Sequence, residues 1–277
     1  MKILVLAVNY NSNEKAKAYL TSWDKAAQVA CIDTEVTVVV ADNSEKYETM
    51  QGDWPSLCWM QVPTHANRGY LGAVSYVIQE KKFDLNVFDY CVICNVDLEV
   101  SQDFLTILEK KQYENTIGCI APMIYSLGEH RNRNPKILSR PSAKKMRSFQ
   151  LMYEFPVIYQ LNKVKNHFRN KREHVYKEQL QIYAPHGSFM IFTRPVASFL
   201  QSFQYPAFLF GEEIYFAENI RQMGLHVIYE PELKVTDYDH ESTGKTRKRT
   251  FYNWNAQAMK FLTGEYFKNE SDREKNL

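Results

Sequence analysis

Short, continuous apolar runs alternate with amphipathic stretches along the first hundred residues of the chain. Runs of this kind predict strands that are buried on both faces, as in a mostly parallel sheet. The expected strands are Ile3–Val8, Glu35–Asp42, Trp59–Pro63 and Tyr90–Asp97, and the expected helices are Asn13–Ala30 and Gly72–Lys82. The alternation predicts an α/β fold of the Rossmann-like kind, in which helices flank the sheet.

The second half of the chain gives fewer clear elements. The segment Gln181–Arg194 predicts a strand interrupted at Gly187, where a close backbone approach or a bend is natural because glycine has no side chain. The remaining expected elements are a helix over Glu213–Met223 that Gly224 ends, a short strand over Leu225–Pro231 and a helix over Tyr252–Phe261.

Polar residues follow the predicted strands at the points where they end. They are Asn9, Tyr10 and Asn11 after the first strand, Asp42, Asn43 and Ser44 after the second, and Asn95 and Asp97 at the fourth. Ligands of open α/β sheets bind outside these strand ends, so the residues should converge on one site. The first turn, VNYNSN, has no glycine, which disfavours a dinucleotide-binding or P-loop protein.

The segment 129–178 differs from the rest of the chain in charge. It holds thirteen Lys and Arg against four Glu, a net charge of +9, while the whole chain carries +2, so the remainder carries −7 by subtraction. Aromatic and aliphatic residues are interleaved with these charges. The pattern fits either a surface that contacts anionic lipid headgroups or a polyanionic acceptor, or a solvated helical lid. Nucleic-acid binding is disfavoured because no recognised motif accompanies the charge.

Cysteine usage and the N-terminus favour a cytoplasmic protein. The five cysteines form no spaced framework and are expected to be buried free thiols. Cys91 and Cys94 form a CxxC, but on a strand they should point to opposite faces, which disfavours a redox or zinc role. The apolar run of MKILVLAVNYN is too short for a signal peptide or a membrane span. Membrane contact would then be peripheral, at the inner face of the cell membrane.

The tripeptide Asn95–Asp97 is a candidate metal site. Residues two apart on a strand point the same way, so Asn95 and Asp97 could offer oxygens to one hard cation. A plain turn at the end of a strand is the alternative.

Five blocks in order resemble the family 2 glycosyltransferases of the GT-A fold, most closely the rhamnosyltransferase-like branch. The blocks are VVVADNS, HANRGYLGAVSYVI, CNVDLEV, APHGSFMIFTR and FLFGEEIYFAENIRQMGLHVIYEPELKVTDYDH. The resemblance covers roughly residues 1–245 apart from the basic segment, which looks like a helical insertion. It implies one domain over 1–265, with a nucleotide-binding half (1–100), an acceptor half (101–265) and a frayed tail (266–277).

The resemblance also implies roles for individual residues. The nucleotide-binding set is Asn9, Tyr10, Asn11, Asp42, Asn67, Arg68, Gly69 and Asn95. Asp97 and His240 would hold Mg²⁺ or Mn²⁺, Gly187 would lie beside the donor sugar and acceptor, and His186 is either a contact there or a filler of the bend. Glu212 and Glu213 would form the catalytic pair, with Glu213 as the base.

This implied activity is a metal-dependent, inverting hexosyl- or deoxyhexosyltransferase. Its partners would be a nucleotide-sugar donor and a glycan or lipid-linked acceptor in surface polysaccharide synthesis, and a homodimer is compatible with it. Glu213, crowded by Glu212 and flanked by apolar residues, is expected to hold its proton more tightly than an exposed glutamate. Both acids would also suit the first turn of a helix, where they complement its dipole.

Three departures from the family pattern support an alternative. Asn95 replaces an aspartate, Glu213 is one methylene longer than the usual base, and Tyr215 stands at a position that is usually acidic. A degenerate homologue that binds a nucleotide sugar without turnover, or a partner subunit, would show such changes. A nucleotidyltransferase is disfavoured because it would need a glycine- and lysine-rich first loop.

Overall fold

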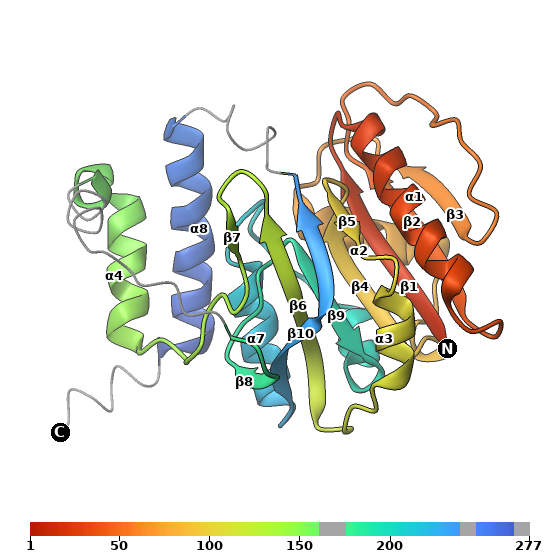
Figure 1. Ribbon diagram of the computed structural model, residues 1–277. Coiled ribbons are helices and arrows are strands. Elements are labelled where there is room, and N and C mark those ends of the chain that lie inside the picture. The colour runs from red at the N-terminus through yellow and green to blue at the C-terminus, as the bar shows by residue number, and fades with distance from the viewer. Residues whose placement is uncertain (161–175, 239–247, 269–277) are drawn as a thin grey trace.

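The computed structural model describes residues 1–160, 176–238 and 248–268 of the 277-residue chain (Figure 1). Its centre is a ten-stranded sheet in the order β3-β2-β1-β4-β9-β6-β10-β5, with β7 paired to β6 and β8 paired to β10. The strands are β1 (Lys2–Asn9), β2 (Glu35–Asp42), β3 (Cys58–Pro63), β4 (Tyr90–Asn95), β5 (Leu98–Val100), β6 (Ile117–Ser126), β7 (Arg131–Asn132), β8 (Leu180–Ile182), β9 (Phe189–Thr193) and β10 (His226–Asp237). The long pairings are parallel, whereas β9 is antiparallel to both of its neighbours.

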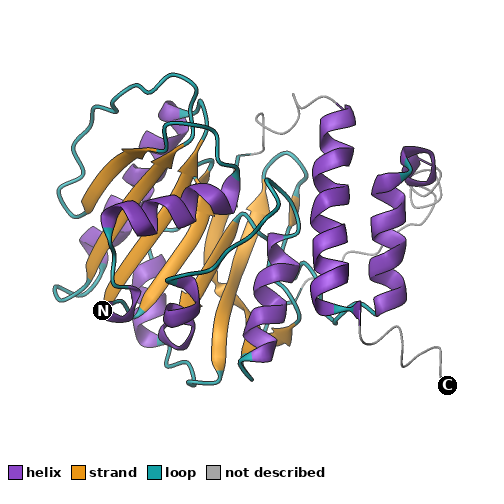
Figure 2. Ribbon diagram, turned by 180° about the vertical axis from the view of Figure 1, so that it is seen from behind, coloured by secondary structure: helices purple, strands orange, loops and turns teal. Residues whose placement is uncertain are grey.

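Helices cover both faces of the sheet (Figures 1 and 2). They are α1 (Asn13–Val29), α2 (Tyr70–Lys81), α3 (Phe104–Lys110), α4 (Ala143–Glu154), α6 (Ala197–Leu200), α7 (Glu212–Gln222) and α8 (Lys248–Tyr266), with short 3-10 turns η1 (Leu85–Val87) and η2 (Arg194–Val196). Along β1, Ile3 and Val5 pack with α1 and α3, while Leu4 and Leu6 pack with α2 and α7. Burial on both faces explains why the first strands are continuously apolar.

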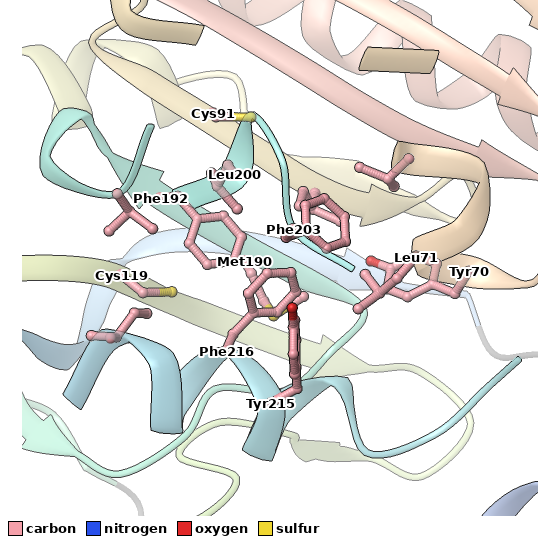
Figure 3. Close-up of a cluster of buried hydrophobic side chains, with 14 of the residues drawn as sticks. Tyr70, Leu71, Cys91, Cys119, Met190, Phe192, Leu200, Phe203, Tyr215 and Phe216 are labelled. Carbon is pink, nitrogen blue, oxygen red and sulfur yellow. The ribbon is translucent and has the colours of Figure 1, made fainter. Parts of the chain in front are cut away.

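The core beneath α7 is rich in aromatic side chains (Figure 3). Phe192 of β9 packs against Phe216 of α7 with ring centroids 4.7 Å apart, and Phe203 lies 5.7 Å from the same ring. All three side chains are buried. Aromatic pairs at these distances add to the free energy of burial, so the helix that begins with Glu212 and Glu213 is firmly seated.

The strands and helices predicted over the first hundred residues match the structure closely, whereas β5, α3 and β6 were not predicted and Gln181–Arg194 is not one interrupted strand. The chain forms β8, which pairs with β10, and then crosses to form β9 between β4 and β6. The intervening residues are held elsewhere, because the backbone N–H of His186 donates to the Asn134 side chain at 2.8 Å. The predicted short strand at Leu225–Pro231 is also longer, since β10 continues past Pro231 through a register shift.

The basic segment is not a single surface element. It begins with β7 in the sheet and continues to α4, which packs beside α8 at one side of the sheet (Figure 1). Arg133 pairs with the buried carboxylate of Asp237 at 2.8 Å, and Arg140 pairs with the buried carboxylate of Glu218 at 2.6 Å. Part of the predicted surface charge therefore stabilises the fold. Residues 161–175 of this segment, His240 and the tail from 269 lie outside the described residues.

The structure confirms one prediction about the cysteines and contradicts another. Cys91 and Cys94 are buried on opposite faces of the sheet, as predicted, and burial raises the pKa of Cys91 to about 12. Cys31 and Cys58 are exposed, contrary to the expectation of buried thiols, because they lie just outside α1 and at the start of the edge strand β3.

Over residues 1–160, 176–238 and 248–268, no helix combines the length and apolar character that crossing a bilayer requires.

Candidate active site

A cavity of about 530 Å³ opens at the carboxyl ends of β1, β2 and β4. The first half of the chain contributes mostly hydroxyl and amide groups to its lining, and the second half contributes acids, aromatic rings and one lysine. The polar lining from the first half is Tyr10, Ser12, Asn43, Asn67, Tyr70, Asn95 and Asp97, with Gly69. The lining from the second half is Lys136, His186, Gly187, Ser188, Phe208, Leu209, Phe210, Glu212, Glu213 and Trp254.

Two predicted nucleotide ligands, Asn9 and Asp42, are buried behind the cavity. The Asp42 carboxylate accepts hydrogen bonds from the Asn9 side chain at 3.2 Å, from the Ser44 backbone and hydroxyl at 3.0 and 2.5 Å, and from Gln61 at 2.6 Å. Its acceptor sites are thus engaged within the protein. Asn11, whose N–H donates to the Ser44 hydroxyl, also stands outside the lining, so these residues shape the loop that presents Tyr10.

Gly69 lies on the first wall at a point where the backbone is closely approached. Its φ of +73° favours glycine, and a Cβ there would lie 2.0 Å from the Phe208 carbonyl oxygen. The Asn43 side chain donates to the Gly69 carbonyl at 2.8 Å, so Asn43, one of the polar residues predicted to converge at the strand ends, fixes this turn. Arg68 turns away from the cavity, with its guanidinium 4.2 Å from the Tyr76 ring centroid.

Asp97 stands in the turn between β4 and β5, next to Asn95 at the end of β4. Both line the cavity, but the strand predicted over Tyr90–Asp97 ends at Asn95, so strand alternation does not place Asp97 there. Within the described ranges, no three His, Cys, Asp or Glu side chains are grouped as a metal site. A hard cation at Asp97 would accordingly take one carboxylate from this wall and complete its shell with oxygens of a ligand and water, which suits Mg²⁺ or Mn²⁺ arriving with a diphosphate.

The opposite wall is the start of α7. Gly211 precedes the helix with φ +82°, and Glu212 and Glu213 form its first turn. A Cβ at Gly187 would lie 2.8 Å from both Cγ and Oε1 of Glu212, which confirms the close backbone approach predicted at that glycine. The Tyr70 hydroxyl donates to the Gly187 carbonyl at 2.8 Å. This contact joins the first wall to the second.

Burial and the neighbouring acid change the pKa of Glu212. Desolvation, and then the charge of Glu213, raises the pKa of Glu212 to about 8, while Lys136 acts in the opposite direction. From the sequence, we expected the raised pKa at Glu213. The structure places it one residue earlier, because Glu212 is the acid that packs against the Gly187 backbone.

Tyr70 shows that the acids of the two walls act on one region. Burial raises its pKa, and interactions with Cys94 and with the acids Glu212, Glu213 and Asp97 add to the effect. A protonated phenol therefore lies within the electrostatic reach of both the candidate metal ligand and the candidate base.

Lys136 is an unexpected part of the cavity, because it belongs to the basic segment. The buried Asn134 side chain accepts from the His186 backbone and donates to the Pro122 carbonyl, each at 2.8 Å. Just beyond Lys136, Ile137 bridges to Ala184. The lysine is thus held from both sides on the wall that carries Glu212.

His186 lines the cavity, and its role there stays a prediction. Its Nδ1 accepts from the Ser188 backbone at 3.2 Å and lies 2.9 Å from the Ser188 hydroxyl. A nitrogen that accepts a backbone N–H carries no proton, which assigns the proton of a neutral ring to Nε2.

Aromatic side chains form the rim of the cavity on the second wall. Trp254 of α8 packs on Phe208 with ring centroids 4.7 Å apart, and Phe251 packs on Phe210 at 5.2 Å. All four rings are partly exposed. Sequence reasoning did not place α8 near the site, since nothing local to the helix indicates it.

Tyr215 lies in the core rather than in the cavity (Figure 3). Its hydroxyl donates to the Gln204 carbonyl at 2.8 Å. Two helical positions after Glu213, a side chain points to the opposite side of the helix. This departure from the family pattern therefore removes no group from the site.

No protein-family model and no curated protein matches the chain, but solved structures do. The mannosyltransferase PcManGT from Pyrobaculum calidifontis, in complex with GDP-Man and Mn²⁺, is 16% identical over 87% of this chain and 57% of its own, with a TM-score of 0.50. GalNAc-T7 with UDP, GalNAc and Mn²⁺ is 14% identical over 87% and 44%, with a TM-score of 0.53. S. aureus TarS 1–349 with UDP-GlcNAc is 12% identical over 89% and 62%, with a TM-score of 0.51.

The chain spans 44–62% of the length of these three proteins. At such low identity the likeness concerns the arrangement of the sheet and its helices. The chain has the GT-A fold that is found in these nucleotide-sugar glycosyltransferases.

Proposed function

We propose that the chain is a glycosyltransferase that moves a sugar from a nucleotide-diphosphate donor to a hydroxyl group of an acceptor. One observation carries the proposal: a single cavity at the strand ends of a GT-A fold holds Asp97 on one wall and Glu212 and Glu213 on the other. The rhamnosyltransferase-like branch, the sugar, and a glycan or lipid-linked acceptor remain predictions from the sequence.

The first wall is suited to the donor. Tyr10, Asn43 and Asn67 offer ring, amide and hydroxyl groups to a base and ribose, and Asn9 and Asp42 keep their loop in place from behind. Asp97 would hold the divalent cation, with His240 as a second proposed ligand. When bound, such a cation neutralises charge on the diphosphate and so favours its departure.

The second wall is suited to the acceptor. We assign the base role to Glu213, which takes the proton of the attacking hydroxyl in an inverting displacement. With a pKa of about 8, Glu212 is largely protonated at neutral pH, so the pair shares one negative charge. A protonated Glu212 can donate a hydrogen bond to the acceptor.

This assignment makes a signed prediction about pH. Activity should fall as the pH rises through about 8, where Glu212 loses its proton, and the Glu212→Gln variant, which keeps a donor, should lose this alkaline limb. If Glu212 were the base instead, activity would rise through the same range and Glu212→Gln would be inactive. A pH–rate profile of the two proteins decides between these outcomes.

Donor binding can be tested without knowing the acceptor. We expect calorimetry with UDP and GDP to show binding that Mn²⁺ strengthens, and we expect Asp97→Asn to remove the metal effect. Asp103→Asn, at the N-cap of α3 and outside the cavity lining, should leave the metal effect intact. Nucleotide binding that is unaffected by Mn²⁺ and by Asp97→Asn would contradict the proposed donor site.

A nucleotide-sugar-binding homologue without turnover is the second candidate, and the specific observation that favours it is Asn95 in the cavity wall at a position that is usually acidic. Tyr215 no longer supports it, because that side chain lies in the core. Such a protein would bind nucleotide and metal as above but release no nucleoside diphosphate from any donor with any acceptor.

A further inference from the structure

Exposed apolar side chains gather at the end of α4. Phe155 is 55% exposed and Val157 is 72% exposed, and Leu151 and Ile158 on either side are exposed by nearly half. Single exposed apolar residues are ordinary on protein surfaces, but a cluster in so short a stretch marks an interaction site.

The two sides of α4 have different partners. Ala143 and Met146 are buried, and Tyr153 packs 6.2 Å from Phe251 of α8, so this side faces the protein. The outward side follows the helical spacing Lys144, Arg147, Leu151 and Phe155, all exposed. The outward side of α4 thus carries cationic side chains in its first turns and apolar side chains in its last turn and just after it.

The charge around the apolar end is positive. Lys145 stands next to the strip with its ammonium 5.7 Å from the Phe149 ring centroid, and Lys248 and Arg249 are exposed at the start of α8, where the end of α4 meets it. Among the described residues around this end of α4, Glu154 is an acid, and the Gln150 side chain donates to it at 2.8 Å. The five basic side chains described here, Lys144, Lys145, Arg147, Lys248 and Arg249, favour an anionic partner.

We infer that this outward side of α4 docks on an anionic lipid bilayer, with Leu151, Phe155, Val157 and Ile158 entering the interface and the lysines meeting the headgroups. An apolar tip flanked by cations is the composition that interfacial helices use. Arg133 and Arg140 of the basic segment do not take part, because they pair with buried carboxylates.

The docking surface is continuous with the cavity through packed aromatic rings. Phe210 lines the cavity and packs 5.2 Å from Phe251, which in turn lies 6.2 Å from Tyr153 and 6.3 Å from Tyr159, beside Ile158. Docking of α4 would therefore hold the acceptor wall close to the bilayer surface. The inference does not depend on the proposed transfer, since a docked protein need not be an enzyme.

Point variants are the right test, because removing the whole basic segment would also remove β7 and Lys136 from the sheet and cavity. We expect the wild-type chain to sediment with phosphatidylcholine vesicles that contain phosphatidylglycerol, and not with pure phosphatidylcholine vesicles. The double variant Phe155→Ser with Val157→Ser should lose this binding. Lys144→Gln with Lys145→Gln should weaken it by roughly 25-fold, about fivefold for each cation.

A matched control separates position from net charge. Lys81→Gln with Lys110→Gln changes the charge equally on α2 and α3, at exposed sites away from α4, and should bind vesicles nearly as the wild type does. Thermal melts should be unchanged in every variant, because all of the substituted side chains are exposed. Turnover on a water-soluble acceptor should also be unchanged, which keeps failure of docking distinct from failure of the proposed function.

Insertion can be measured directly with a tryptophan at the tip. The fluorescence of Phe155→Trp should be quenched by lipids brominated on their acyl chains, whereas Val87→Trp, at an exposed site on η1, should not be quenched. Equal binding to neutral vesicles, unchanged affinity in the patch variants, or absent quenching would overturn the inference. Light scattering that shows self-association abolished by Phe155→Ser with Val157→Ser would overturn it too, because the surface would then join copies of the chain.

Discussion

Replacing Glu212 with glutamine should stabilise the folded chain at neutral pH. The folded state raises the pKa of Glu212 from its ordinary value of 4.5 to about 8, so at pH 7 folding must bring in a proton that the unfolded chain does not hold. At 1.36 kcal/mol per pKa unit, this uptake costs at most about 3 kcal/mol. Because the side chain is partly open to the cavity, we expect a gain of about 1–2 kcal/mol from a glutamine that keeps the shape without the charge.

The pH dependence gives the prediction its sign. A carboxyl group with a raised pKa in the folded state binds more protons when folded than when unfolded between about pH 4.5 and 8. The stability contribution is therefore fully present below about pH 4.5 and is lost as the pH rises toward 8. Glu212→Gln cannot titrate, so its advantage over the wild type should grow across this window and level off above it.

Thermal melts of the two proteins across this pH range provide the assay. For a chain of this size, each kcal/mol moves Tm by about 2–4 °C, so the shift at neutral pH is within reach of an ordinary melt. Glu14→Gln serves as a control, because Glu14 is an exposed acid paired with Lys17. A Glu212→Gln variant that is less stable than the wild type, or that shows the same pH slope, would refute the reasoning.

Two further substitutions test the fold around the site by denaturant unfolding. Gly69→Ala should lower the free energy of unfolding by about 3 kcal/mol or more, because φ is +73° and the added Cβ would meet a carbonyl oxygen. Gly72→Ala within α2 should be neutral or stabilising. Equal effects of the two substitutions would contradict this account of Gly69. Arg140→Met should cost about 1.5–3 kcal/mol because it removes one charged donor from the buried Glu218 carboxylate, which keeps Tyr183 and Arg221, whereas Arg194→Met, at an exposed pair, should cost less than about 1 kcal/mol. A loss of less than about 1 kcal/mol in Arg140→Met would show that the buried pair contributes little.

The lowered pKa of Glu218 explains why its buried ion pair with Arg140 stabilises the fold. Burial alone would raise the pKa of this carboxyl, but hydrogen bonds from Arg140, Tyr183 and Arg221 outweigh burial and hold the pKa below its usual value. Its stabilising contribution is consequently present above the ordinary glutamate pKa and is lost as the pH falls through the lowered one.

The first half of the fold could be predicted because its signals are local. Strands such as Glu35–Asp42 are buried on both faces and are apolar at nearly every position, and α1 has a clear helical period. The second half resisted prediction because local pattern does not specify a strand's partner. The residues of β8 and β9 are close in sequence, yet they pair at different places in the sheet.

Residues of the candidate site that belong to a sequence motif were singled out in advance. Residues that reach the cavity only through the packing of distant segments were not. Gly187 and Glu212 were both singled out, but their contact joins residues 25 positions apart and no periodicity announces it. Lys136 and Trp254 reach the cavity through β7 and α8, and neither carries a local signature. The inward turn of Tyr215 could have been anticipated, because it follows Glu213 by two positions on a helix.

The central claim is that Glu213 activates an acceptor hydroxyl opposite a donor held at Asp97. Its most direct test is the rate of nucleoside-diphosphate release from a panel of nucleotide sugars, with Mn²⁺ and an extract of candidate acceptors, by the wild type and by Glu213→Gln. We predict acceptor-dependent release that Glu213→Gln lowers by about 10²–10⁴-fold while nucleotide binding is unchanged. Equal rates in the two proteins would contradict the account.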